Sequence, residues 1–120
     1  DNAPMLPPWV ACLTAADLGP FPLRVHQFWV GSPYPTDPAL QRAMATWQHA
    51  GVEYTLWNGT EAAAVLSGAW LRAFRALEGR PSQQKDFFMY AVLFQFGGLF
   101  VDVDVTSAAP PASWLLELGA

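Results

Sequence analysis

Short apolar stretches that alternate with longer mixed ones predict strands separated by helices. Leu23–Val30 (LRVHQFWV) is rich in β-branched and aromatic residues and is bounded by proline and glycine, which predicts a short interior strand. Glu53–Trp57 (EYTLW) alternates and ends at an Asn-Gly pair, which predicts a second strand. Leu99–Val105 (LFVDVDV) alternates with a period of two and predicts a third strand.

The first predicted helix, Pro38–Ala50, has a chemical signal at each end. Asp37 is a good N-cap, and proline occupies the first helical position, where its missing N–H costs nothing. Gly51 follows the last residue, where a left-handed conformation ends many helices.

Further helices are predicted between the second and third strands. Ala62–Leu77 is expected to be helical, capped by Thr60 and broken near its central glycine. Gln83–Phe96 is expected to form a helix that Ser82 caps and that Gly97 terminates.

The resulting order of strand, helix, strand, helices and strand predicts an α/β fold with a mostly parallel sheet flanked by helices. Ligands are then expected at the carboxyl ends of the strands. Residues 1–22, with five prolines among them, are interpreted as a proline-rich lead-in segment. Residues 23–120 are expected to form one domain or part of one, because a chain of 120 residues closes a single core.

Composition excludes several classes of protein. The net charge of -4 and the pI near 4.8 argue against nucleic-acid binding, which requires clustered Lys and Arg side chains. Cys12 has no cysteine partner, and with only His26 and His49 it cannot complete a zinc cluster. The most apolar stretch, Phe87–Val101, is shorter than the ~20 residues that span a bilayer.

Asp102 and Asp104 are the strongest candidates for chemistry. In a strand of period two they share one side with Phe100, whereas the valines between them face the other way. Two carboxylates at a strand end suit a hard cation such as Mn²⁺ or Mg²⁺, whose remaining positions go to phosphate oxygens and water. The alternative is that both carboxylates are simply solvated.

Several other side chains are weaker candidates. Asp86 is expected early in a helix, where it either complements the helix dipole or binds ligand hydroxyls. Trp29 and Trp57 end the first two strands, so both could reach one crevice and stack on a nucleobase, although tryptophan is more often a core residue. Ser32 is a candidate polar contact, and His26 is interpreted as a hydrogen-bonded structural residue.

Val25–Ser32 (VHQFWVGS), Glu53–Trp57 (EYTLW) and Lys85–Val105 (KDFFMYAVLFQFGGLFVDVDV) together resemble the DXD-containing glycosyltransferases of family 32. That family includes initiating α-1,6-mannosyltransferases and sphingolipid-mannosylating enzymes. The resemblance implies a GT-A fold, in which a Rossmann-like nucleotide-sugar-binding half precedes the acid pair. It also implies transfer with retention of the anomeric configuration.

By position in the motif, the resemblance makes Asp102 and Asp104 the metal-binding and catalytic residues. It makes Asp86 a contact to sugar hydroxyls and Trp29 the aromatic residue that stacks on the base. The sequence departs from the family where an arginine usually follows the helix acid, because Met89 stands there. That change removes a cation and its fork of donors from the expected donor site.

The expected activity is metal-dependent transfer of a hexose, mannose among the candidates, from GDP-mannose or a UDP-hexose to a glycan or glycolipid. The chain is expected to be the donor-binding part, truncated after the acid pair and incomplete as an enzyme. The alternatives are a catalytically impaired nucleotide-sugar-binding module and a metal-free structural domain. A membrane anchor outside the chain is compatible with the resemblance, which suggests the Golgi lumen for a eukaryotic source and the cytoplasm for a bacterial one.

Overall fold

A computed structural model describes residues 23–30, 35–111 and 113. The elements follow the order β1 (Arg24–Phe28), α2 (Pro38–Ala45), β2 (Glu53–Trp57), α3 (Gly59–Ala64), α4 (Gly68–Ala76), α5 (Pro81–Phe96) and β3 (Leu99–Phe100). The strands form a parallel sheet in the order β2-β1-β3, so β1 lies at its centre. The predicted α/β class is confirmed, whereas the predicted lead-in at 1–22 lies outside the described residues.

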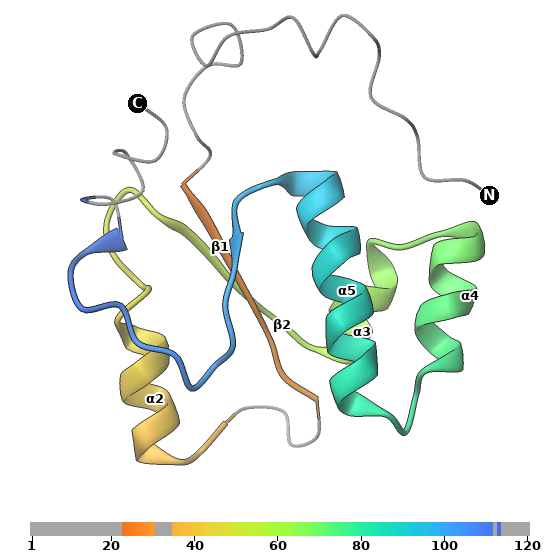
Figure 1. Ribbon diagram of the computed structural model, residues 1–120, viewed down its shortest axis with the longest axis horizontal. Coiled ribbons are helices and arrows are strands. Elements are labelled where there is room, and N and C mark those ends of the chain that lie inside the picture. The colour runs from red at the N-terminus through yellow and green to blue at the C-terminus, as the bar shows by residue number, and fades with distance from the viewer. Residues whose placement is uncertain (1–22, 31–34, 112, 114–120) are drawn as a thin grey trace, which may run out of the picture.

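Helices cover both faces of the sheet, with α2 on one side of the strands and α3, α4 and α5 on the other (Figure 1). The reason is the alternation of side chains along β1. Val25 packs with Trp47, which follows α2, and with Val101. Phe28 packs on the opposite face against a core that contains Phe88 of α5. Each face of the central strand is therefore buried by its own set of helices.

Helix α2 begins where the sequence predicts but ends early. The Asp37 carboxylate accepts a hydrogen bond of 2.8 Å from the Ala39 N–H, as expected of an N-cap. The helix stops at Ala45, before the predicted end at Ala50. Backbone N–H groups after it reach carbonyls only three residues back, and Trp47 in this tighter turn is only 4% exposed. Burial of the indole accounts for the early end.

The region predicted as one interrupted helix forms two separate helices, α3 and α4. The predicted break is confirmed, since Gly68 has a positive φ of 54°. The predicted cap is wrong, because Asn58 and not Thr60 caps α3. The Asn58 side chain accepts from the Glu61 N–H at 2.8 Å, and the Glu61 carboxylate accepts in return from the Asn58 N–H at 3.4 Å. This reciprocal pair satisfies two helix-end donors at once and starts the helix earlier.

Helix α5 also starts earlier than predicted, at Pro81. Proline is favoured at the first helical position because its fixed φ already matches the helix. Ser82 therefore lies inside the first turn, and the prediction that it caps the helix is wrong. The predicted end is confirmed, because α5 stops at Phe96 and Gly97 adopts a positive φ of 70°.

The third strand is much shorter than the predicted Leu99–Val105. Pairing with β1 ends just after Phe100, with a 2.9 Å hydrogen bond from the Val101 N–H to the β1 backbone. The chain then turns, and the Val105 N–H donates to the Asp102 carbonyl at 3.1 Å. The acid pair consequently lies in a turn at the end of a strand, and the predicted period of two does not extend through it.

Candidate functional site

Trp29 leaves β1 at the carboxyl edge of the sheet. Its backbone N–H donates to the Trp57 carbonyl at 2.9 Å, which extends the pairing with β2 by one bond. Trp29 follows Val25 and Gln27 in the alternation along β1 and so lies on the face covered by α2, near Leu40. Its indole Nε1 is buried and has no hydrogen-bond partner among the described residues.

The turn that carries the two aspartates is held from inside the fold. The Gln27 amide donates to the Asp102 carbonyl at 3.1 Å, and its oxygen accepts from the Tyr54 hydroxyl at 2.5 Å. At the other end of the turn, the Trp47 indole N–H donates to the Val105 carbonyl at 2.8 Å. Gln27 is completely buried. Sequence analysis missed its role, although a glutamine inside an apolar strand is a signal that a buried hydrogen-bond partner exists.

Trp29, Asp102 and Asp104 line one cleft, which we call the carboxylate cleft. It has a volume of about 480 Å³. Its walls are formed by residues from β1, α2, the start of α5 and the turn after β3, namely Phe28, Trp29, Val30, Leu40, Pro81, Ser82, Lys85, Asp102, Val103 and Asp104. In the order β2-β1-β3 the chain winds away from β1 in opposite directions, so the space beyond β1 and β3 is where α/β sheets bind ligands.

Lys85 is a charged residue of this cleft that sequence analysis did not select. Its Nζ donates to Asp102 Oδ1 at 2.9 Å, with the lysine side chain 30% exposed and the aspartate side chain 50% exposed. The hydrogen bond to Asp102 raises the pKa of Lys85, with the negative charges of Asp86 and Asp104 adding to the effect. Asp104 makes no hydrogen bond or ion pair within the part of the chain that the structure describes.

The two exposed carboxylates of Asp102 and Asp104 fit a hard divalent cation by their chemistry. Mg²⁺ and Mn²⁺ prefer oxygen ligands and commonly take only one or two carboxylates, with water and substrate phosphates completing the shell. Across residues 23–30, 35–111 and 113, no group of three or more His, Cys, Asp and Glu side chains could hold a metal ion. The donor set therefore suits a cation shared with a phosphate ligand and not a closed protein site.

Two other predicted site residues lie elsewhere. Asp86 is exposed on α5 and does not line the carboxylate cleft, although it directly follows Lys85. The face that it shares with Tyr90 is turned outward, since Tyr90 is 68% exposed. Ser32 lies outside the described residues.

Trp57 and His26 belong to the opposite face of the sheet. The Trp57 indole N–H donates to His26 Nδ1 at 3.1 Å, and its ring packs edge-on against Phe88 at 5.4 Å between centroids. The expectation that Trp57 shares a crevice with Trp29 is therefore wrong, because the alternation along the strands sends the two indoles to opposite faces. The structural interpretation of His26 is confirmed, since its other nitrogen, Nε2, donates to the Gly97 carbonyl at 2.9 Å.

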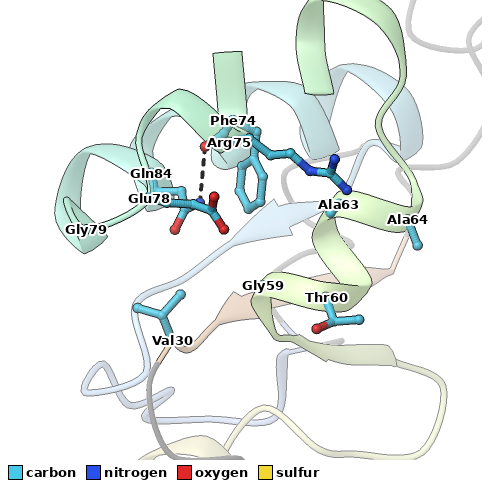
Figure 2. Close-up of a pocket in the computed structure, with 10 residues that line it drawn as sticks. All are labelled: Val30, Gly59, Thr60, Ala63, Ala64, Phe74, Arg75, Glu78, Gly79 and Gln84. Atoms are coloured by element: carbon cyan, nitrogen blue, oxygen red, sulfur yellow. Dashed lines mark hydrogen bonds between the residues drawn. The ribbon is translucent and has the colours of Figure 1, made fainter. Parts of the chain in front are cut away.

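A second cavity, of about 610 Å³, lies on the face of the sheet that α3, α4 and α5 cover (Figure 2). It is larger than the carboxylate cleft, but none of the predicted site residues that the structure describes lines it. Its polar side chains include Thr60 of α3, Arg75 of α4, Glu78 of the turn after α4 and Gln84 of α5. The amide of Gln84 is already committed to the Phe74 carbonyl at 3.1 Å. Of the residues that the structure describes, only Val30 lines both cavities.

Compared with family models, with curated proteins and with solved structures, the chain shows no match. Among the helices that the structure describes, none is long and apolar enough to cross a membrane. Function is therefore inferred from the residues and their geometry.

Proposed function

We propose that this chain is the donor-binding part of a metal-dependent, retaining glycosyltransferase with a GT-A fold. The observation that carries the proposal is the convergence of Trp29, Asp102 and Asp104 on one cleft at the carboxyl edge of the sheet. An aromatic ring and a pair of carboxylates in one cleft match two parts of a nucleotide-sugar, which are its flat base and its cation-bound diphosphate.

Each residue has a separate task in this proposal. The face of Trp29 stacks on the nucleobase, because an indole offers a large apolar surface at the rim of the cleft. Asp102 and Asp104 hold Mn²⁺ or Mg²⁺. A cation held there would supply positive charge to a departing diphosphate. Asp86 lies outside the cleft, so its proposed contact to a sugar hydroxyl requires the sugar to extend from the cleft over the exposed side of α5.

The chemistry then depends on positioning and electrostatics more than on proton transfer. The described residues that line the cleft include no histidine, and His26 is buried with both ring nitrogens hydrogen-bonded. Stabilisation of negative charge on a leaving group needs fixed cations and donors but no general base. The acceptor, a glycan or glycolipid hydroxyl, is proposed to bind residues that complete the site beyond this donor half.

The first experiment measures thermal unfolding of the whole chain with UDP, GDP, UDP-glucose and GDP-mannose, each with and without Mn²⁺. A ligand that binds only the folded state stabilises it by about 2.7 kcal/mol at a hundredfold excess over the dissociation constant. We expect this stabilisation with one base, only in the presence of Mn²⁺, and we expect Asp104→Asn to abolish it.

Glu53→Gln is the matched control, because it also removes one exposed carboxylate but at the amino end of β2, away from the cleft. It should retain the nucleotide response of the native chain. A chain that shows no Mn²⁺-dependent nucleotide response would contradict the proposal and would favour the metal-free structural domain.

A catalytically impaired binding module is a second candidate, and Met89 is the observation that favours it. Met89 is a half-buried residue of α5 and brings no charge to the position where the resembled family usually has arginine. Such a module binds metal and nucleotide but holds the sugar ring poorly. It is distinguished by nucleotide binding without hydrolysis of the sugar donor.

A further inference from the structure

Lys85 forms an ion pair with Asp102, one of the two carboxylates proposed to bind the cation. The lysine extends from near the start of α5 and reaches Asp102 Oδ1 at 2.9 Å, and both residues line the carboxylate cleft. Asp104 has no such partner in the described part of the chain, so the two carboxylates are inequivalent. Both carboxylates are exposed to solvent, but only Asp102 is paired with a cation of the described part of the protein.

The geometry makes the lysine and a metal ion competitors. A cation that bound Asp102 Oδ1 would take lone pairs of the oxygen that now accepts the hydrogen bond of Lys85. A carboxylate that is released from an ammonium group binds a divalent cation more strongly, and the nearby positive charge of the lysine also repels that cation. Lys85 therefore weakens metal binding as long as it remains on Asp102.

The same side chain is suited to a second position. A lysine carries a compact charge on a flexible four-carbon stem, and it is a common point-charge ligand of phosphate. Lys85 lines the cleft together with Asp102 and Asp104. A phosphate bound to a cation on these carboxylates would therefore lie within reach of the flexible lysine side chain.

We propose that Lys85 is an exchangeable counter-ion, which holds Asp102 while the site lacks a cation and moves to the phosphate oxygens when a cation and a diphosphate bind together. The inference rests on the proposed function, and it adds that the cation and the diphosphate bind cooperatively. The cation replaces Lys85 as the partner of Asp102, and the diphosphate becomes the new partner of the released Lys85. By linkage, each must raise the affinity for the other by the same factor.

The test compares Lys85→Met, Lys85→Arg and Arg75→Met with the native chain. Lys85→Met removes the charge and keeps the apolar stem, and Arg75→Met removes one charge from the other cavity as a matched control. Mn²⁺ affinity is measured by titration calorimetry without nucleotide. The affinity for UDP and GDP is then measured at saturating Mn²⁺, and melting curves establish that each variant is folded.

We expect Lys85→Met to bind Mn²⁺ alone roughly tenfold more tightly and the diphosphate at saturating Mn²⁺ roughly tenfold more weakly, which lies within the usual range of coupling between two ligands. Arg75→Met should change neither affinity by more than about twofold, because its charge lies in the other cavity and is screened by salt. Lys85→Arg should keep the diphosphate affinity near that of the native chain, since it keeps the charge.

The outcomes separate this inference from the proposed function. A native chain that binds neither Mn²⁺ nor a nucleotide overturns both. A native chain that binds both ligands, with Lys85→Met indistinguishable from Arg75→Met, overturns the role of Lys85 and leaves the proposed function intact. Weaker binding of Mn²⁺ and diphosphate alike in Lys85→Met also overturns the exchange, because the lysine would then assist both ligands.

Discussion

At the residue scale, His26 is defined by what its two ring nitrogens contact. Nδ1 accepts from the Trp57 indole N–H and Nε2 donates to the Gly97 carbonyl, so the neutral ring is fully hydrogen-bonded. A proton added at Nδ1 would face another donor and break the bond to Trp57. Burial lowers the pKa of His26 from its usual value of 6.5, and the hydrogen bond to the Gly97 carbonyl only partly opposes this effect.

The lowered pKa makes stability depend on pH in a known direction. As the pH falls through 6.5 the unfolded chain gains a proton on this ring, whereas the folded chain gains it only at a lower pH, so the free energy of unfolding should fall as the pH drops. We expect urea unfolding at pH 7.5 and 5.5 to show this fall, and we expect it to be smaller in His26→Asn. That variant should also lose about 1–3 kcal/mol at pH 7.5, because it leaves buried groups without partners.

His49→Asn serves as the control for this measurement, because His49 is exposed after α2. Equal slopes for His26→Asn and the native chain would show that groups other than His26 set the acid sensitivity.

At the scale of elements, the junction between α5 and β3 determines where the acid pair lies. Two glycines with positive φ, Gly97 and Gly98, reverse the chain and lay β3 directly against β1. A Cβ atom on Gly98 would lie 2.5 Å from the Arg24 carbonyl oxygen. This distance is too short for a carbon and an oxygen that are not bonded. The second glycine is thus required both for its backbone conformation and for the close approach of the two strands.

Gly98→Ala should therefore lower the free energy of unfolding by about 3 kcal/mol, from left-handed strain and a backbone clash together. Gly51→Ala isolates the first contribution. Gly51 has a similar φ of 83° and nothing within 4 Å of its added Cβ, so its substitution should cost only about 1–2 kcal/mol. Urea unfolding of both variants measures the difference, and equal losses would contradict the clash.

At the scale of the whole molecule, one aromatic core joins the helices α3, α4 and α5 to the sheet. Phe88 is completely buried and its ring contacts Phe28 of β1, Phe74 of α4 and Trp57 of β2, at 5.4, 5.9 and 5.4 Å between centroids. These contacts bring together segments that are distant in the sequence, and they orient the helix from which Lys85 extends.

Phe88→Ala should lower the free energy of unfolding by about 3–5 kcal/mol, because it removes a buried ring and leaves a cavity. A domain of this size has only about 5–15 kcal/mol of stability, so the loss should be visible as a large fall in the urea midpoint. Phe94→Ala on the same helix is the control. Phe94 is 56% exposed, and its loss should cost less than about 1 kcal/mol. Similar losses in both variants would show that the ring of Phe88 is not the centre of the core.

Local signals determined much of this architecture. Asp37 and Gly97 mark helix ends because capping and left-handed conformations depend only on the neighbouring residues. The range Glu53–Trp57 could be predicted as a strand because its alternation and the Asn-Gly pair that follows it are also local signals. The carboxylates were recognised as candidates because two aspartates after an apolar strand form a pattern within the sequence itself.

Only the tertiary structure decided which side chains meet. The alignment of β1 with β2 and β3 decides three of these contacts. It sets the ion pair between Lys85 and Asp102 and the hydrogen bond from Gln27 to the Asp102 carbonyl. It also places Trp29 and Trp57 on opposite faces of the sheet. The early end of the third strand arises in the same way, since buried side chains of other elements take the carbonyls of the turn. Capping and periodicity act over a few residues, whereas strand register is set by packing between segments far apart in the chain.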